Sequence, residues 1–315
     1  MNLLELVNAF PHRADTSVPD WMLGYFRRRA ISFCHGKTDL DTHVSWLQSR
    51  NFTIDLRLPP PDDRLPAKPP HTYTREEWQQ LADYEGWQAD CRWDGRALQW
   101  QEGTSLQLHN RWPEPALLHR VGNCMMEFAP GGTYVEDWRL QPNRTGPMIG
   151  LRLLDECNPD TDVVYHRGGG LIVCGDYAGL VLGRPETPPS FPFPNALRRL
   201  AGDDATRHEE LAALFRFETS VATGTIDGGY RIRHSTCPWR VGLPLLSLED
   251  FRFDPDHNTV QHAFDIDGEP RLRTFTIDTL EPVFAFHDST PCTTAAADWL
   301  QQEAPTLDRY ARRLT

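Results

Sequence analysis

The chain lacks several features that would place it in a membrane or outside the cell. Its 315 residues contain no run of about eighteen apolar residues, the length that a membrane-spanning helix needs. The amino terminus has no basic stretch ahead of an apolar core, so no secretory signal is expected. Leu3, Leu4, Val7 and Phe10 fit one face of a short helix instead.

Disulfide and zinc spacings are also missing, as is an excess of positive charge. The seven cysteines are an odd number, and no two have the two-residue spacing of a zinc knuckle. A chain of this length does not need disulfide staples, so reduced thiols and a cytoplasmic location are expected. The net charge of -12 argues against a nucleic-acid partner, whose phosphates it would repel.

The common catalytic signatures are absent too. No HExxH and no Gly-x-Ser-x-Gly motif occurs, and no cysteine shows a local nucleophile signature. The glycines that follow His166 and Arg167 stand between two strand-like runs, so a hairpin or bulge is expected there rather than a phosphate loop. We therefore expect neither a metal nor a cofactor and assign no catalytic residue.

What the chain does contain is short apolar runs separated by turn-forming residues. Hydrophobic residues make up only 39%, but ten Trp, fifteen Phe and eight Tyr supply bulky core material. About fifteen strand-like runs follow one another with hairpin spacing, and no regular helix comes after each strand. This pattern predicts an all-β protein made of two lipocalin-like antiparallel β-barrels with a few short helices.

A proline pair suggests how the two barrels divide the chain. Pro113 and Pro115 interrupt strand pairing just before a new series of strands. The predicted domains are an amino-terminal barrel over 1–113 and a carboxyl-terminal barrel over 114–315. The second carries a helical insertion near 194–213 and a carboxyl-terminal helix.

Some local elements within this division can be predicted in more detail. Thr74 and Glu77 have the spacing of a capping box and predict a short helix. Residues 44–58 are expected to form one strand, and Glu102-Gly103 a hairpin turn. Trp87, Trp93, Trp100 and Trp112 recur in this region and are expected to pack in the core.

The sharpest candidate site lies on the strand predicted around residues 134–140. Tyr134, Glu136 and Trp138 share one strand face, and Asp137 and Arg139 share the other. A carboxylate inside a barrel would be desolvated, and its pKa would rise unless an Arg or Lys paired with it. Such a group could hold a polar or cationic ligand or act as a general acid or base. Which face points inward stays open; if it is the other one, Asp137 takes this role.

Further candidates lie on neighbouring strands. Asp55 and Arg57 share a strand face and could orient a ligand, or they could form a cross-strand ion-pair network. His119 and Glu127 lie on the run before the 134–140 strand. With His166 and His234 they could form a polar cluster or, because His and carboxylate ligands suit zinc, a metal site, although no metal-binding motif supports the second alternative.

Two of these stretches resemble a known family. Trp46, Gln48, Asp55 and Arg57 match a first-barrel strand pattern, and Tyr134, Glu136, Trp138 and Arg139, with Glu127 before them, match a second-barrel pattern. The family is a fungal one of paired lipocalin-like barrels, named for interaction with a casein-kinase-type protein kinase. The resemblance implies two barrels with interior space and implies no particular reaction.

These observations predict a cytoplasmic small-molecule-binding protein whose ligand is a small hydrophobic or aromatic molecule. The predicted ligand-binding residues are Tyr134, Glu136, Trp138, Glu127, His119, Asp55 and Arg57. One alternative is a non-covalent lyase, hydratase or isomerase that uses Glu136 and His119. Another is a protein-interaction module with filled barrels, which binds a protein partner through its loops at 59–85 and 185–212.

Overall fold

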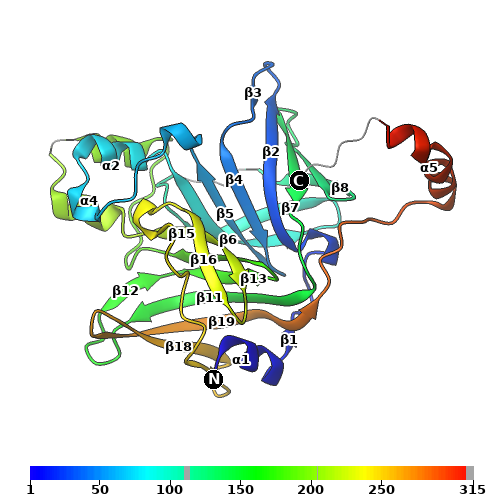
Figure 1. Cartoon of the computed structure of the whole chain (residues 1–315). Coiled ribbons are helices and arrows are strands. Elements are labelled where there is room, and N and C mark those ends of the chain that lie inside the picture. The colour runs from blue at the N-terminus through cyan, green and yellow to red at the C-terminus, as the bar shows by residue number, and fades with distance from the viewer. Residues whose placement is uncertain (110–113, 204, 310–315) are drawn as a thin grey trace.

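The computed structural model describes residues 1–109, 114–203 and 205–309. Strands make up 45% of it and helices 17%, so the protein is mostly β, as predicted (Figure 1). Among the helices in these ranges, none is long and apolar enough to cross a membrane.

Eight antiparallel strands form a closed barrel. They are β2 (Gly24–Phe33), β4 (His43–Gln48), β5 (Phe52–Leu58), β6 (Glu85–Trp93), β7 (Ala97–Ser105), β8 (Ala116–Val121), β9 (Cys124–Phe128) and β10 (Tyr134–Leu140). Each pairs with the next, and β10 returns to pair with β2, which closes the ring. A short strand, β3 (Thr38–Asp39), pairs antiparallel with the end of β2. One closed antiparallel barrel is therefore present.

Two local predictions in this barrel need correction. Residues 44–58 form a hairpin, β4 and β5, because the polar turn residues 49–51 interrupt an otherwise continuous alternation. Glu102 and Gly103 lie inside β7 rather than in a turn. Glu102 has a φ of +46°, and the β6–β7 register shifts beside it, so the pair forms a bulge.

The remaining strands form a second sheet that does not close. Its members are β1 (His12–Arg13), β11 (Gly146–Cys157), β12 (Val164–Arg167), β13 (Gly169–Cys174), β14 (Tyr177–Leu182), β15 (Glu218–Thr225), β16 (Gly229–Ser235), β17 (Phe251–Asp254), β18 (Thr259–Ile266) and β19 (Glu269–Phe284). The strand path ends at β16 on one side and at β17 on the other. The prediction of a second closed barrel is therefore not confirmed. The glycine run before residue 171 does join two strands, as predicted.

The predicted boundary between residues 113 and 114 falls inside the closed barrel. Strands β8, β9 and β10 follow that boundary in the chain, yet they pair with β7 and β2. Trp112 and Pro113 themselves lie outside the described residues. The strand with Tyr134 and Glu136 is thus the last strand of the first barrel, not part of a carboxyl-terminal one.

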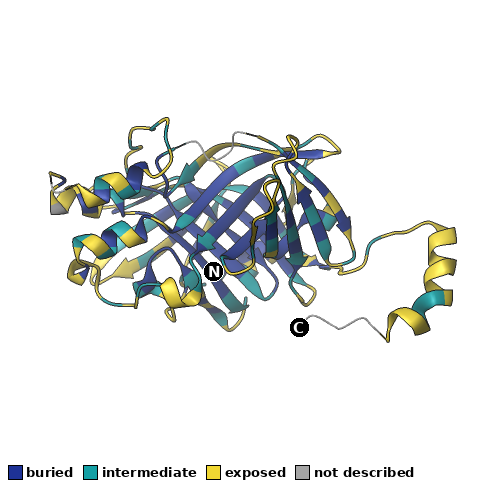
Figure 2. Cartoon of the chain, turned by 90° about the horizontal axis from the view of Figure 1, so that it is seen from above, coloured by how far each residue is buried: buried dark blue, intermediate teal, exposed yellow. Residues whose placement is uncertain are grey.

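The barrel and the second sheet pack face to face. The outer faces of β4, β5 and β6 lie against β13, β14 and β15, with Leu47, Ile54, Ile172 and Val181 in the shared core. Figure 2 shows the buried residues concentrated along these strands. On the other face of the second sheet, α1 (Leu3–Ala9) packs against a separate cluster of Leu, Ile and Val side chains. That face is filled with aliphatic side chains.

Three short helices cover one end of the molecule. They are α2 (Arg75–Leu81), α3 (Ala196–Gly202) and α4 (His208–Leu214). Thr74 and Glu77 form the predicted capping box at α2, and the two helices expected near 194–213 are present. Figure 1 shows α5 (Thr294–Leu307) standing away from the barrel at the end of an extended segment.

A polar contact joins the β4–β5 turn to the second sheet. The Asp278 carboxylate accepts hydrogen bonds from Ser49 Oγ at 2.6 Å and from the Asn51 backbone N–H at 3.1 Å. Gly150 lies under this contact, where a Cβ would stand 2.0 Å from Ser49 Oγ. The residue must therefore be glycine for the turn to approach β11 so closely.

A buried histidine in the second sheet predicts a pH effect on stability. His262 is fully buried, and its ring stacks on Phe251 with centroids 4.2 Å apart and on Phe264 at 5.1 Å. Burial, together with the charge of Arg273, lowers the pKa of His262 to about 3. The unfolded chain therefore binds a proton below about pH 6.5 that the folded protein does not. The free energy of unfolding should fall by up to about 1.4 kcal/mol per pH unit as the pH drops.

Substituting His262→Phe keeps the aromatic stack and removes this titration. We expect the free energy of unfolding, measured with urea between pH 6 and 4.5, to depend less on pH in the variant than in the wild type, by the equivalent of one bound proton. Equal slopes of the free energy of unfolding against pH would contradict the assignment.

Candidate functional site

A cavity of about 380 Å³ lies inside the closed barrel. Six of the seven predicted ligand-binding residues line it: Asp55, Arg57, Glu127, Tyr134, Glu136 and Trp138. They come from β5, β9 and β10, and period-two alternation turns all of them to the interior. The seventh, His119, is exposed on β8 and does not line the cavity.

The two strand faces of β10 differ clearly. Glu136 is 3% exposed and Trp138 1% exposed, and both lie inside. Asp137 and Arg139 lie on the other face, where the Arg139 guanidinium pairs with the Asp137 carboxylate at 2.8 Å. The question that the sequence left open is thus decided, and Asp137 does not take the interior role.

Two interior carboxyl groups face each other across β9 and β10. Glu127 and Glu136 are directly opposite in the strand register. Trp138 Nε1–H donates to Glu127 Oε2 at 3.0 Å, and the Tyr134 hydroxyl donates to Glu127 Oε1 at 3.3 Å. Burial raises the pKa of Glu127 well above its ordinary value, and the charge of Glu136 raises it further. Glu127 is therefore a carboxyl group poised to keep its proton.

Glu136 has a basic partner that the sequence did not single out. Arg28 on β2 donates to Glu136 Oε1 at 2.9 Å and to Asp39 Oδ2 at 2.7 Å. The side chain of Arg28 is only 6% exposed. Arg28 is thus the kind of basic partner that the sequence analysis considered for a carboxylate inside the barrel. Its signal was the run of three arginines on one strand, of which only the middle one points inward.

Asp55 and Arg57 pair with each other inside the barrel. The Arg57 guanidinium donates to Asp55 Oδ1 at 2.9 Å, and Asp55 is 2% exposed. Burial raises the pKa of Asp55, while the charge of Arg57 opposes the rise. The pair lies on the cavity wall, and Arg57 Nε also lies 3.9 Å from the carboxylate of Glu85 on the neighbouring strand β6. The cross-strand ion pairing that the sequence allowed is therefore present as well.

Four indole rings form much of the remaining wall: Trp46, Trp87, Trp100 and Trp138. Trp46 packs edge-on against Trp138 with centroids 5.1 Å apart and against Trp100 at 5.7 Å. Trp87 and Trp100 were expected to be core residues only. Their positions on the cavity follow from the register of β6 and β7, which local sequence patterns do not reveal.

The cavity carries more negative than positive groups. Its lining includes five carboxyl groups and two guanidiniums: Asp39, Asp55, Glu114, Glu127 and Glu136 against Arg28 and Arg57. Even with a proton on Glu127, the carboxylates outnumber the guanidiniums. A ligand with a positive charge, or with several hydrogen-bond donors, would balance this excess.

The other histidines considered with His119 do not join it. His166 bonds through Nδ1 to the Gly183 carbonyl at 2.9 Å, and His234 stacks on His43 at the junction of the barrel and the second sheet. Within the described ranges, no group of three or more His, Cys, Asp or Glu side chains could hold a metal ion.

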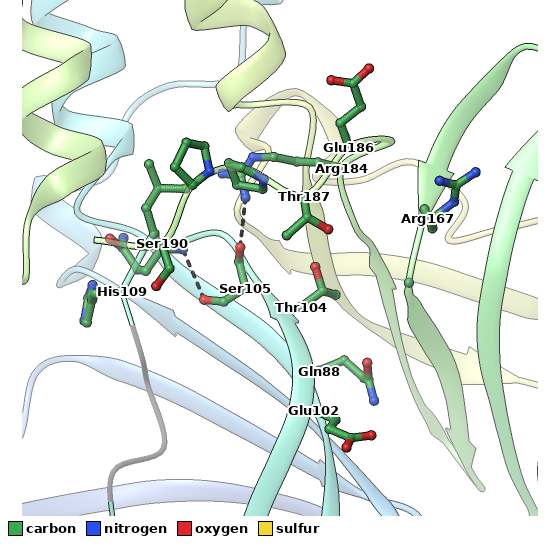
Figure 3. A pocket seen from close by; sticks show the side chains of 16 residues that line it. Gln88, Glu102, Thr104, Ser105, His109, Arg167, Arg184, Glu186, Thr187 and Ser190 are labelled. Atoms are coloured by element: carbon green, nitrogen blue, oxygen red, sulfur yellow. Dashed lines mark hydrogen bonds between the residues drawn. The ribbon is translucent and has the colours of Figure 1, made fainter. Parts of the chain in front are cut away.

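A larger cavity, of about 630 Å³, lies between the end of β7 and the segment after β14. Figure 3 shows Arg184 reaching toward Ser105, with Thr104, Thr187 and Ser190 around it. The Arg184 guanidinium donates to the carbonyls of Leu214, Ser105 and Leu106, at 2.6, 2.9 and 2.7 Å. Backbone oxygens occupy the donors of this guanidinium. Arg184 therefore holds the segments around residues 105 and 214 together rather than binding a ligand. The barrel cavity is the better candidate site.

Comparisons with known proteins add no relative to this geometry. No protein-family model, no curated protein and no solved structure matches the chain. The function is therefore argued from the cavity itself.

Proposed function

We propose that the protein binds a small organic molecule inside the closed barrel, in the manner of a lipocalin. The ligand combines an aromatic or apolar body with a positively charged amine or guanidine group. The observation that carries the proposal is the aromatic-walled cavity in which carboxylates outnumber guanidiniums. Membership of the fungal family of paired lipocalin-like barrels and a cytoplasmic location are parts of the same proposal.

The wall chemistry supports each half of this ligand. Indole faces attract cations through their ring quadrupole, by about 0.5–2 kcal/mol per contact. Glu136 and Asp39 share the single Arg28 guanidinium, so the negative charge of these two carboxylates is only partly balanced. A cavity of about 380 Å³ also falls within the usual range for small-molecule sites.

The two alternative functions find less support. The lyase, hydratase or isomerase hypothesis needs a histidine near Glu136, but His119 lies on the outside of the barrel. The interaction-module hypothesis needs filled interiors, and the closed barrel has a cavity. The segments 59–85 and 185–212 contact each other through α2 and α3. Among the described residues, no observation points to a protein partner for these two segments.

Three matched probes test the charge preference. Phenethylamine, 2-phenylethanol and phenylacetate share one aromatic body and differ in charge. We expect isothermal titration calorimetry at pH 7 to give the tightest binding for the amine and the weakest for the carboxylate. The difference between these two should be at least tenfold, about 1.4 kcal/mol. Phenylacetate binding as tightly as phenethylamine would overturn the proposal.

Glu136→Gln tests the role of the interior carboxylate. The substitution keeps the side-chain shape and removes the charge, so we expect amine affinity to fall about tenfold while phenylethanol affinity stays within twofold. His119→Gln, on the outside of β8, is the matched control and should bind all three probes as the wild type does. Circular dichroism confirms that each variant is folded at the titration temperature.

A further inference from the structure

Two histidines and three arginines gather at one edge of the junction between the barrel and the second sheet. His43 on β4 and His234 on β16 stack with ring centroids 3.8 Å apart. Arg27, Arg64 and Arg233 surround them, and we call these five residues the arginine–histidine cluster. None of them belongs to the cavity inside the barrel.

The arginines of the cluster lack acidic partners. Arg27 bonds to His43 Nδ1 at 3.2 Å, Arg64 Nε–H donates to the Pro59 carbonyl at 2.8 Å, and Arg233 Nε–H donates to Thr223 Oγ1 at 2.8 Å. Among the described residues, no carboxylate forms an ion pair with any of the three. The three guanidiniums therefore leave a local excess of positive charge at this edge of a chain whose net charge is -12.

The histidines report the same local excess of positive charge. Burial, together with the neighbouring His234, Arg27 and Arg64, lowers the pKa of His43 to about 2. Burial, together with Arg64, Arg27 and Arg233, lowers the pKa of His234 to about 4. Both rings are therefore neutral at pH 7. His43 uses both of its ring nitrogens, on Arg27 and on Ser45 Oγ at 2.9 Å, which leaves His234 to donate an N–H to a ligand without adding charge.

A cavity adjoins the cluster. It has a volume of about 210 Å³. Its lining combines the polar residues Arg64, Arg233, His234, Tyr84 and Ser235 with the apolar Leu58, Leu65, Ala67, Pro238 and Val241. The Arg64 and Arg233 terminal nitrogens have no hydrogen-bond partner among the described residues, so they are available to a ligand in it. Arg27, which is bonded to His43, adds its positive charge from the barrel side.

We propose that the arginine–histidine cluster binds a phosphate group, with Arg64 and Arg233 as the charged contacts and His234 as a neutral hydrogen-bond donor. Guanidinium groups suit this ligand because their paired N–H groups match two phosphate oxygens. The cavity is large enough for a phosphate and small enough to keep a larger body outside it. The site is distinct from the barrel cavity and prefers the opposite charge.

Inorganic phosphate is the probe. We expect it to raise the melting temperature of the wild-type protein more than sodium chloride does at equal ionic strength. In a ¹H–¹⁵N spectrum of the imidazoles, phosphate should shift His43 and His234 and leave the other histidines in place. No excess over sodium chloride, or shifts spread over all the histidines, would overturn the proposal.

Variants identify the contacts. Arg64→Gln and Arg233→Gln should each weaken phosphate binding at least tenfold, while Arg252→Gln, which removes an exposed arginine on β17, should leave it unchanged. Wild-type affinity in Arg64→Gln and Arg233→Gln would overturn the assignment. If either variant fails to fold, the imidazole shifts of the wild type still decide. Glycerol 3-phosphate, tested alongside, distinguishes a free ion from a phosphate carried on an organic body; binding of either at the cluster supports the proposal.

Discussion

Substituting Asp278→Ala is expected to lower the free energy of unfolding by about 3–5 kcal/mol. The Asp278 carboxylate is 1% exposed and accepts hydrogen bonds from Ser49 Oγ, the Asn51 backbone and side chain, and Arg152 Nη1 at 3.1 Å. Its removal leaves a buried hydroxyl, an amide and part of a guanidinium without their acceptor. Losing one partner from such a buried polar network costs far more than losing both.

Urea denaturation measures this loss. The slope of the free energy of unfolding against urea concentration should be the same in the variant and the wild type. Asp298→Ala on α5 removes an exposed carboxylate and is the matched control, with an expected change within about 0.5 kcal/mol. A loss below about 1 kcal/mol for Asp278→Ala would mean that the β4–β5 turn does not depend on this contact. The hydrophobic packing of β4–β6 on β13–β15 would then hold the two sheets together alone.

Substituting Glu127→Gln is expected to stabilise the protein at neutral pH by more than about 1 kcal/mol. The pKa of Glu127 is raised in the folded barrel, so the folded protein holds a proton that the unfolded chain releases above about pH 4.5. The free energy of unfolding therefore falls as the pH rises from that value toward the folded-state pKa, by up to about 1.4 kcal/mol per unit. Glutamine mimics the protonated form and removes this dependence.

The amide can satisfy the same neighbours. Its oxygen can accept from Trp138 Nε1–H, and the Tyr134 hydroxyl can turn to accept from its NH₂ group. Unfolding measured between pH 5 and 8 should show a flatter profile for Glu127→Gln than for the wild type. An identical pH dependence would show that Glu127 is ionised in the folded protein.

The facing residue should respond in the opposite direction. Glu136→Gln removes one of the two carboxylates that the buried Arg28 guanidinium contacts, so we expect this variant to be destabilised by about 1–3 kcal/mol. Two glutamates opposite each other on neighbouring strands thus have different roles. Burial raises the pKa of Glu127, whereas Glu136 is paired with the Arg28 guanidinium at 2.9 Å. The second is the group that we assign to the charged end of the ligand.

Local patterns in the sequence predicted part of this site because strand geometry is local. Period-two alternation is enough to place Tyr134, Glu136 and Trp138 on one face, and Asp55 with Arg57 on another. Turn chemistry and capping likewise predicted the helix after Thr74 and the predominance of strands. These conclusions depend on residues within a few positions of one another.

What only the tertiary structure decided depends on contacts between distant residues. Arg28 and Glu136 are 108 positions apart, and they meet because β10 pairs with β2. Because the barrel closes in this way, it extends past residue 113 to β10. Trp87 and Trp100 line its cavity, and His119 lies on its outside. The order and register of the strands depend on how whole sheet faces pack. The alternation of apolar and polar residues along one strand shows only that the strand has a buried face. The sequence therefore determined which side chains stand together on a strand, and the fold decided which strands face one another.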